Sequence, residues 1–198
     1  MSAAGAPRFL LASASPRRSE LLRAAGYRFE IVTCPTEEIA PTTLTVREIT
    51  CWNAFRKGLA VARAHPDAVV LAADTLVALE REIIGKPTDL ADARRILQRL
   101  NGRAHTVATG VLIAHLARGQ SETFAVVSRV HFRKWNRAQI DNYLSAIEPL
   151  DKAGAYAAQG RGRAIVGRIV GSRTNVIGLP LEKTRAALAR FGIRPGRP

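Results

Sequence analysis

Two adjacent arginines, Arg17 and Arg18, stand where an apolar run gives way to a helical pattern in the stretch LASASPRRSELLRAAG. The first turn of a helix exposes free backbone N–H groups and the positive end of the helix dipole, so it favours an anion. Guanidinium groups match phosphate oxygens in a bidentate way. The junction therefore predicts a phosphate site, to which Ser13 and Ser15 add hydroxyl groups. The alternative is that Ser15 only caps the helix and the arginines are solvated.

A single aspartate, Asp74, follows the apolar run AVVLAA at residues 68–73. We expect it to close a buried strand at its carboxyl end, where ligands lie in open α/β sheets. A charge there needs a partner, and a metal ion, a role as general base or a structural salt bridge would each provide one. Glu37 and Glu38 follow a second predicted strand and supply hard oxygen atoms of the kind that bind Mg²⁺.

Lysine is scarce beside arginine in this chain, and two lysines lie in loop contexts: Lys86 in Gly-Lys-Pro and Lys152 in Asp-Lys-Ala-Gly. A compact ammonium charge in a loop suits a phosphate ligand. The four histidines show no metal-ligand spacing. The sequence also has no nucleophile elbow, Walker loop or GxGxxG motif, so a P-loop kinase and a Rossmann dehydrogenase are disfavoured.

The chain is strongly basic, with 30 Lys and Arg against 16 Asp and Glu and a formal net charge of +14. Such a charge attracts nucleic acid or steers a polyphosphate, although arginines on solvated faces give the same composition. No apolar run reaches the roughly 20 residues of a membrane helix, and no secretory signal pattern opens the chain. We therefore expect a cytoplasmic protein with no membrane partner, in which Cys34 and Cys51 are reduced, buried thiols.

Hydrophobic periodicity predicts strands and helices that alternate over most of the chain. Strands are expected at residues 9–12, 29–32, 68–73, 105–116 and 122–133, with a hairpin over 75–84 and short strands within 154–178. Helices are expected at 16–25, from a capping box at Thr45 and Glu48 to before Pro66, at 89–100, from Asn136 to about 147, and at 181–191. The tail, 194–198, is expected to fray. A long antiparallel pair interrupts the alternation, so we expect an α/β fold with a mixed sheet.

Five segments together resemble the Maf family of nucleoside triphosphate pyrophosphatases, over nearly the whole chain. They are LASASPRRSELL, AADTLV, IIGKPTDLADARRILQRLNGRAHTVATGV, EPLDKAGAYAAQG and NVIGLPLEKT. The resemblance implies an enzyme dependent on Mg²⁺ or Mn²⁺ that splits a nucleoside triphosphate between the α and β phosphorus, releasing pyrophosphate. It also implies one domain over residues 1–198, with an elongated mixed β-sheet flanked by helices as in the inosine triphosphate pyrophosphatases. Relatives further suggest a homodimer.

The same resemblance assigns roles to residues. Asp74 matches the proton acceptor of the family, and Glu38, with or without Asp74, would hold the metal. The positions implied in substrate binding are Ser13, Arg18, Lys57 and Lys86. The positions that distinguish the branches of the family read Arg17, Thr75 and Gln159, as in the branch that acts on dTTP and UTP, and Gln159 also matches a conserved contact position. Whether Asp74 serves as base or as metal ligand stays open.

The chain also departs from the family pattern. Arg173 stands where many members have an aromatic residue, Asn101 replaces a usual serine, and the net charge is unusually basic. Two alternatives therefore remain. One is a pyrophosphatase for modified or other nucleotides, of the 7-methyl-GTP or inosine triphosphate type. The other is a basic nucleic-acid-binding protein with a regulatory nucleotide site, which would bind duplex DNA with a steep salt dependence and release no pyrophosphate.

Overall fold

The computed structural model describes residues 7–196 and is built around one mixed seven-stranded sheet. The strand order is β2-β1-β3-β5-β6-β7, with β4 paired to β3. The strands are β1 (Phe9–Leu11), β2 (Glu30–Ile31), β3 (Val69–Leu79), β4 (Glu82–Ile84), β5 (Ala104–His115), β6 (Gln120–Phe132) and β7 (Val166–Val170). β1 runs parallel to β2 and β3, and the other pairs are antiparallel, which confirms the predicted mixed sheet.

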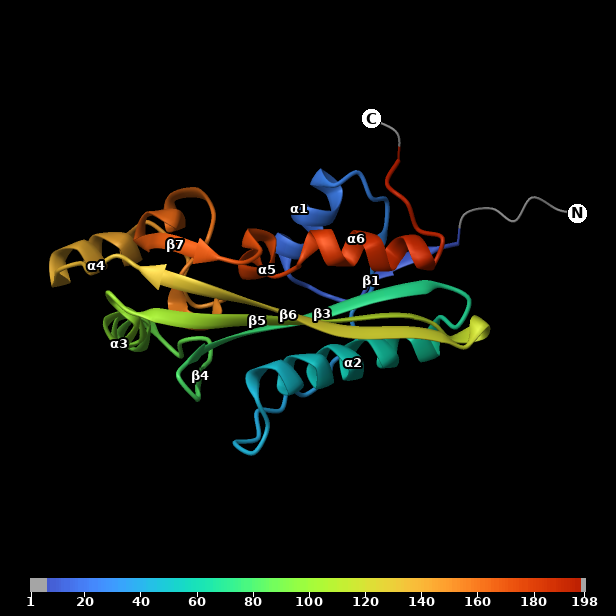
Figure 1. The fold of residues 1–198 in the computed structure, drawn as a ribbon, viewed down its shortest axis with the longest axis horizontal. Helices are drawn as coiled ribbons and strands as arrows, with labels where there is room; N and C mark the ends of the chain where they lie inside the picture. The colour runs from blue at the N-terminus through green and yellow to red at the C-terminus, as the bar shows by residue number, and fades with distance from the viewer. Residues whose placement is uncertain (1–6, 197–198) are drawn as a thin grey trace, which may run out of the picture.

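Helices cover both faces of the sheet, and the molecule is elongated along β5 and β6 (Figure 1). The α-helices are α1 (Pro16–Ala24), α2 (Val46–Ala64), α3 (Leu90–Leu100), α4 (Arg137–Ser145), α5 (Arg173–Ile177) and α6 (Leu181–Arg190). Short 3-10 helices are η1 (Leu116–Arg118), η2 (Ala153–Ala155) and η3 (Gly160–Ile165). In Figure 1, α2 lies on one side of the central strands, and α1, α5 and α6 lie on the other. Within residues 7–196, no helix combines the length and apolarity that crossing a membrane requires.

The long central strand β3 differs most from the prediction. Asp74 was expected to end a strand, but it lies in the middle of β3, which continues to Leu79. The reason is its pairing with β5, which runs from Val70 to Ala78 of β3 without a break. The hairpin predicted over 75–84 is confirmed, because β3 and β4 pair on either side of a turn at Glu80.

Several smaller predictions also need correction. The second strand is only two residues long, and α4 ends at Ser145 rather than near 147. The glycine-rich stretch 154–178 contains one strand, β7, and otherwise forms 3-10 turns and α5. Cys34 is exposed and Cys51 partly buried, so the expectation of two buried thiols is wrong, although both are free. The end of the chain is less frayed than expected, because the Gly196 N–H donates to the Gly26 carbonyl at 2.8 Å; residues 197–198 lie outside the described residues.

Two glycines allow α2 to lie very close to the sheet. Gly110 of β5 pairs in register with Asp74, and a Cβ atom there would lie 2.2 Å from the backbone carbonyl carbon of Thr50 in α2. A Cβ atom on Gly58 of α2 would lie 2.6 Å from the Leu112 side chain. Because neither glycine has a side chain, α2 packs close enough to the sheet for its own side chains to reach Asp74.

We expect Gly110→Ala to destabilise the fold by about 1–3 kcal/mol or more, because the added methyl group meets backbone that has no room to move. Gly85→Ala is the matched control, since a Cβ atom there meets nothing within 4 Å. Urea unfolding followed by circular dichroism measures both. Equal midpoints for the two variants would show that the close approach of α2 is not needed.

Candidate functional site

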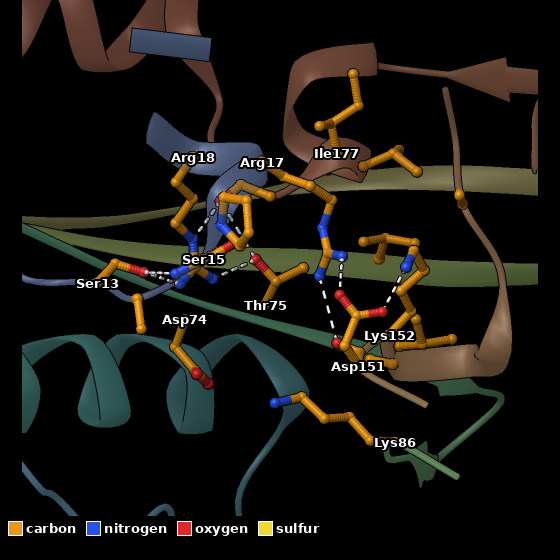
Figure 2. Close-up of a pocket in the computed structure, with 18 of the residues that line it drawn as sticks. Ser13, Ser15, Arg17, Arg18, Asp74, Thr75, Lys86, Asp151, Lys152 and Ile177 are labelled. Atoms are coloured by element: carbon orange, nitrogen blue, oxygen red, sulfur yellow. Dashed lines mark hydrogen bonds and ion pairs between the residues drawn. The ribbon is translucent and has the colours of Figure 1, made fainter. Parts of the chain in front are cut away.

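A pocket of about 400 Å³ opens beside β3, and the nine residues to which the family resemblance assigns a role all line it, as do Ser15 and Lys152. The nine are Ser13, Arg17, Arg18, Glu38, Lys57, Asp74, Thr75, Lys86 and Gln159. They come from the β1–α1 junction, the loop after β2, α2, β3, the loop after β4 and the residue before η3. Figure 2 shows Lys86 extending toward Asp74 from one wall and Arg17 and Arg18 descending from another. Glu37, the neighbour of Glu38, is not among the lining residues.

The pocket exists because one edge of β3 is left open. β1 pairs with β3 only as far as Leu71, and β4 pairs with it only from Val77. Between them, residues 72–76 of β3 have no strand partner on that edge among the described residues. Asp74 therefore lies just beyond the carboxyl end of β1, where the chain turns into α1. Ligands in open α/β sheets generally bind at the carboxyl ends of parallel strands. Here the strand that ends at the pocket is β1, whereas β3 continues past it.

Neighbouring residues of β3 serve opposite faces of the sheet, because side chains alternate along a strand. Asp74 faces α2, where its Oδ1 accepts a hydrogen bond from Lys57 Nζ at 2.7 Å and its Oδ2 one from Asn53 Nδ2 at 3.2 Å. Thr75 faces α1 and α5, where its Oγ1 accepts from Arg18 at 3.0 Å. The pocket thus joins groups from both faces through the open edge of β3.

One ammonium group links the two candidate metal-binding carboxylates. Lys57 Nζ lies 2.6 Å from Glu38 Oε1 and 2.7 Å from Asp74 Oδ1. Asp74 is only 4% exposed, so its charge depends on these partners. Burial acts to raise the pKa of Glu38, but the hydrogen bond and charge of Lys57, with the charges of Lys86 and Arg18, bring that pKa below its ordinary value. Both the salt bridge and the lowered pKa keep Glu38 ionised.

Arg18 is fixed by three hydrogen bonds to the walls of the pocket. Its Nε donates to the Gly178 carbonyl at 2.9 Å, its Nη1 to Ser13 Oγ at 2.9 Å and its Nη2 to Thr75 Oγ1 at 3.0 Å. Burial lowers the pKa of Arg18, and the charge of Asp74 acts against this shift. A guanidinium group has five N–H donors, so Arg18 keeps two for a ligand.

Arg17 has entirely different partners. Its Nη1 donates to Asp151 Oδ2 at 2.8 Å, and Asp151 also contacts Lys152 (Figure 2). The two arginines diverge because adjacent helix positions point about 100° apart. Ser15 occupies the N-cap position as predicted, but its side chain makes no capping hydrogen bond. Instead, its backbone N–H donates to Ser13 Oγ at 3.3 Å.

The sequence analysis missed Asp151, the partner of Arg17, and also Asn53 and Tyr156. Asn53 is 2% exposed, and besides binding Asp74 it donates to the Ile39 carbonyl and accepts from the Ile39 N–H, both at 3.0 Å. It therefore ties the loop that carries Glu38 to α2. Tyr156 lines the pocket, and its hydroxyl group lies 3.0 Å from His105 Nε2. A polar residue on the sheet-facing side of α2 was the available signal for Asn53.

The donor set suits a divalent cation that arrives with a phosphate ligand. Within residues 7–196, no group of three or more His, Cys, Asp and Glu side chains gathers to hold an ion by itself. Two carboxylates do meet at the pocket, through Lys57. Mg²⁺ usually takes one or two protein carboxylates and completes its shell with water and substrate phosphates, so Glu38 and Asp74 fit that pattern.

Two known proteins resemble the chain over nearly its whole length, and a solved structure resembles part of it. A dTTP/UTP pyrophosphatase of Symbiobacterium thermophilum is 44% identical over 184 residues, covering 92% of this chain and 93% of its own. One of Myxococcus xanthus is 45% identical over 184 residues, covering 93% and 92%. The solved structure of the Staphylococcus aureus Ham1 protein covers 63% of this chain and 71% of its own, with a TM-score of 0.47 and 15% identity. The family model described as Maf-like protein matches residues 8–191. With this match and these relatives, the chain belongs to the Maf family.

Proposed function

We propose that the chain is a nucleoside triphosphate pyrophosphatase that hydrolyses dTTP and UTP to the monophosphate and pyrophosphate. The observation that carries the proposal is the convergence of Arg18, Lys57 and Lys86 with the carboxylates of Glu38 and Asp74 on one pocket. The printed names of the relatives support the substrate choice. A nucleotide substrate also favours a cytoplasmic location, and a homodimer stays a prediction.

The charges that line the pocket support a triphosphate accompanied by a divalent cation. Five cationic side chains against three carboxylates leave an excess of two positive charges. A nucleoside triphosphate carries about four negative charges, so two remain to be balanced. A bound Mg²⁺ or Mn²⁺ would supply that balance and withdraw charge from the α-phosphoryl oxygens. Glu38, with Asp74 beside it, would hold the cation.

Residues of the chain supply the proton acceptor and the cationic groups that the reaction needs. Asp74 takes the proton from the attacking water, since it is a buried carboxylate held in place by Lys57 and Asn53. Lys57 fixes the position of the Asp74 carboxylate through their salt bridge of 2.7 Å. Arg18 and Lys86 stabilise the negative charge that develops on the departing pyrophosphate.

We assign selection of the nucleobase to Arg17 and Gln159, which both line the pocket. Thr75 Oγ1 already contacts Arg18 and Thr109, so its hydroxyl group acts by placing Arg18. Gln159 lines the pocket and has no hydrogen-bond partner for its side chain within residues 7–196. Its amide can both donate and accept, as the edge of a pyrimidine requires.

A substrate panel tests the proposed function. Pyrophosphate release is measured for dTTP, UTP, CTP, GTP, inosine triphosphate and 7-methyl-GTP with Mg²⁺ and with Mn²⁺. We expect the highest kcat/KM for dTTP and UTP. We expect no pyrophosphate release when a chelator is in excess over the metal. Preference for 7-methyl-GTP or inosine triphosphate would support the alternative enzyme, and no release from any triphosphate would exclude a pyrophosphatase.

Asn53 is expected to act as a positioning residue for Asp74. Asn53→Leu keeps a similar volume but removes the donor to Asp74 and both bonds to Ile39, so we expect kcat to fall about tenfold with a smaller change in KM. Asn53→Gln, which keeps the amide, should recover part of the lost kcat. If Asn53→Leu folds with unchanged kcat, the carboxylate does not need this support.

A further inference from the structure

We propose that a groove beside the nucleotide pocket binds the phosphate backbone of double-stranded nucleic acid. The groove has a volume of about 720 Å³, and five arginines line it: Arg133, Arg161, Arg163, Arg168 and Arg173. No acidic and no aromatic side chain is among its lining residues. Ala158 lines both the groove and the nucleotide pocket, so the two sites adjoin without sharing a charged residue.

Within residues 7–196, these arginines have no carboxylate partner, and they share one groove that has no acidic side chain in its lining. Elsewhere in the described residues, eight arginines pair with acidic groups, as in Arg94 with Asp141 and Arg190 with Glu122, and several single arginines do not. All five groove arginines are exposed, and in the described part of the chain none forms a salt bridge. Like charges gathered in one concave surface repel each other and focus a positive potential, which an anionic ligand relieves.

The fold places the five charges around an edge of the sheet. η3 carries Arg161 and Arg163, the edge strand β7 carries Arg168, and α5 begins at Arg173. Arg133 follows the end of β6. Glycines make up part of the groove lining, at positions 160, 167 and 171. Since they have no side chains, a phosphate backbone can approach the main chain closely there.

The chemistry of the groove favours a duplex over other polyanions. Proteins that hold single strands stack the bases on aromatic side chains, and this groove has none. Arginines that contact only phosphates bind without reading sequence, as expected for a duplex backbone. The surface of a membrane is flat and does not enter a concave groove, whereas the convex phosphate ridge of a duplex does. We therefore expect binding that is independent of sequence and strongly dependent on salt.

The test compares two triple variants that lose the same charge. The groove variant carries Arg161→Gln, Arg163→Gln and Arg168→Gln. The control carries Arg28→Gln, Arg63→Gln and Arg118→Gln, three exposed arginines outside the groove and without salt bridges in the described residues. Two of the control sites belong to the end of α2 and to η1, at the end of the molecule away from β7 (Figure 1).

Fluorescence anisotropy with a labelled duplex of roughly 20 base pairs measures affinity from low to physiological salt. The groove variant should lose at least about tenfold in affinity, and the slope of log K against log salt should become shallower by about 3. The control should lose less than about threefold. Pyrophosphate release from dTTP should be unchanged in both, which separates failure of this proposal from failure of the proposed function.

Three results would overturn the proposal. One is the absence of duplex binding by the wild-type chain at low salt. Another is an equal loss in the groove and control variants, which would assign binding to the overall charge of the protein. The last is a groove variant that keeps duplex binding but loses binding to phosphatidylserine vesicles or to inorganic tripolyphosphate, which would assign the groove to a different anion.

Discussion

Asp74→Asn is expected to lower kcat by about 10²–10⁴-fold with the fold intact, the range for losing a positioned general base. Asn is nearly isosteric with Asp, and its one oxygen can still accept a hydrogen bond from Lys57, but its NH2 group loses the bond from Asn53 and it does not accept a proton from water. Steady-state pyrophosphate release from dTTP measures the loss, and thermal unfolding checks the fold. A loss smaller than tenfold would remove Asp74 from the role of base.

A control and a metal titration sharpen this result. Glu37→Gln makes the same change of charge on an exposed side chain outside the pocket, and its kcat should stay within about twofold of wild type. Half-saturation by Mg²⁺ then separates the two roles left open for Asp74. If Asp74 acts only as base, the Asn variant should saturate at the same Mg²⁺ concentration. If it also holds the cation, saturation should need more Mg²⁺.

Arg18→Ala is expected to lower kcat/KM for every triphosphate by a similar factor. The corresponding loss of transition-state stabilisation is on the order of 1.5–3 kcal/mol, as for charge-assisted hydrogen bonds. The reason is that Arg18 serves the phosphates, which all triphosphates share, and that its loss also frees Ser13 and Thr75. The same variant should unfold at lower urea, since three hydrogen bonds disappear.

Arg17→Trp is the companion variant, because Arg17 points to Asp151 and away from the partners of Arg18. It should change the order of substrates, weakening dTTP and UTP relative to purine triphosphates. Values of kcat/KM for dTTP, UTP, CTP, GTP and 7-methyl-GTP are compared in both variants. Parallel losses across all five in both would show that the arginines form one undivided phosphate clamp.

The sequence predicted which residues line the pocket better than it predicted the secondary structure around them. Ser13, Arg17 and Arg18 could be placed because the strand–proline–helix junction is a local signal, and the family resemblance supplied the distant members. The place of Asp74 was wrong because strand length depends on pairing with β5, which no window around residue 74 contains.

Tertiary contacts account for the other residues that sequence reasoning missed. Gly110 and Asn53 matter only because α2 packs against β3 and β5, a contact between segments far apart in the chain. Asp74 and Thr75 serve opposite faces, and their joint place at one pocket follows from the early end of β1. The secondary structure of the stretch 154–178 was predicted wrongly because glycines at positive φ, such as Gly154 and Gly160, favour 3-10 helices there rather than a series of strands.

The most direct test of the central claim is to hydrolyse dTTP in water labelled with heavy oxygen and to locate the label by mass spectrometry. A pyrophosphatase whose water attacks the α-phosphorus, as Asp74 beside Lys57 and Glu38 would direct, places the label in dTMP and releases unlabelled pyrophosphate. Label in the pyrophosphate, or release of single phosphate with dTDP, would contradict the account.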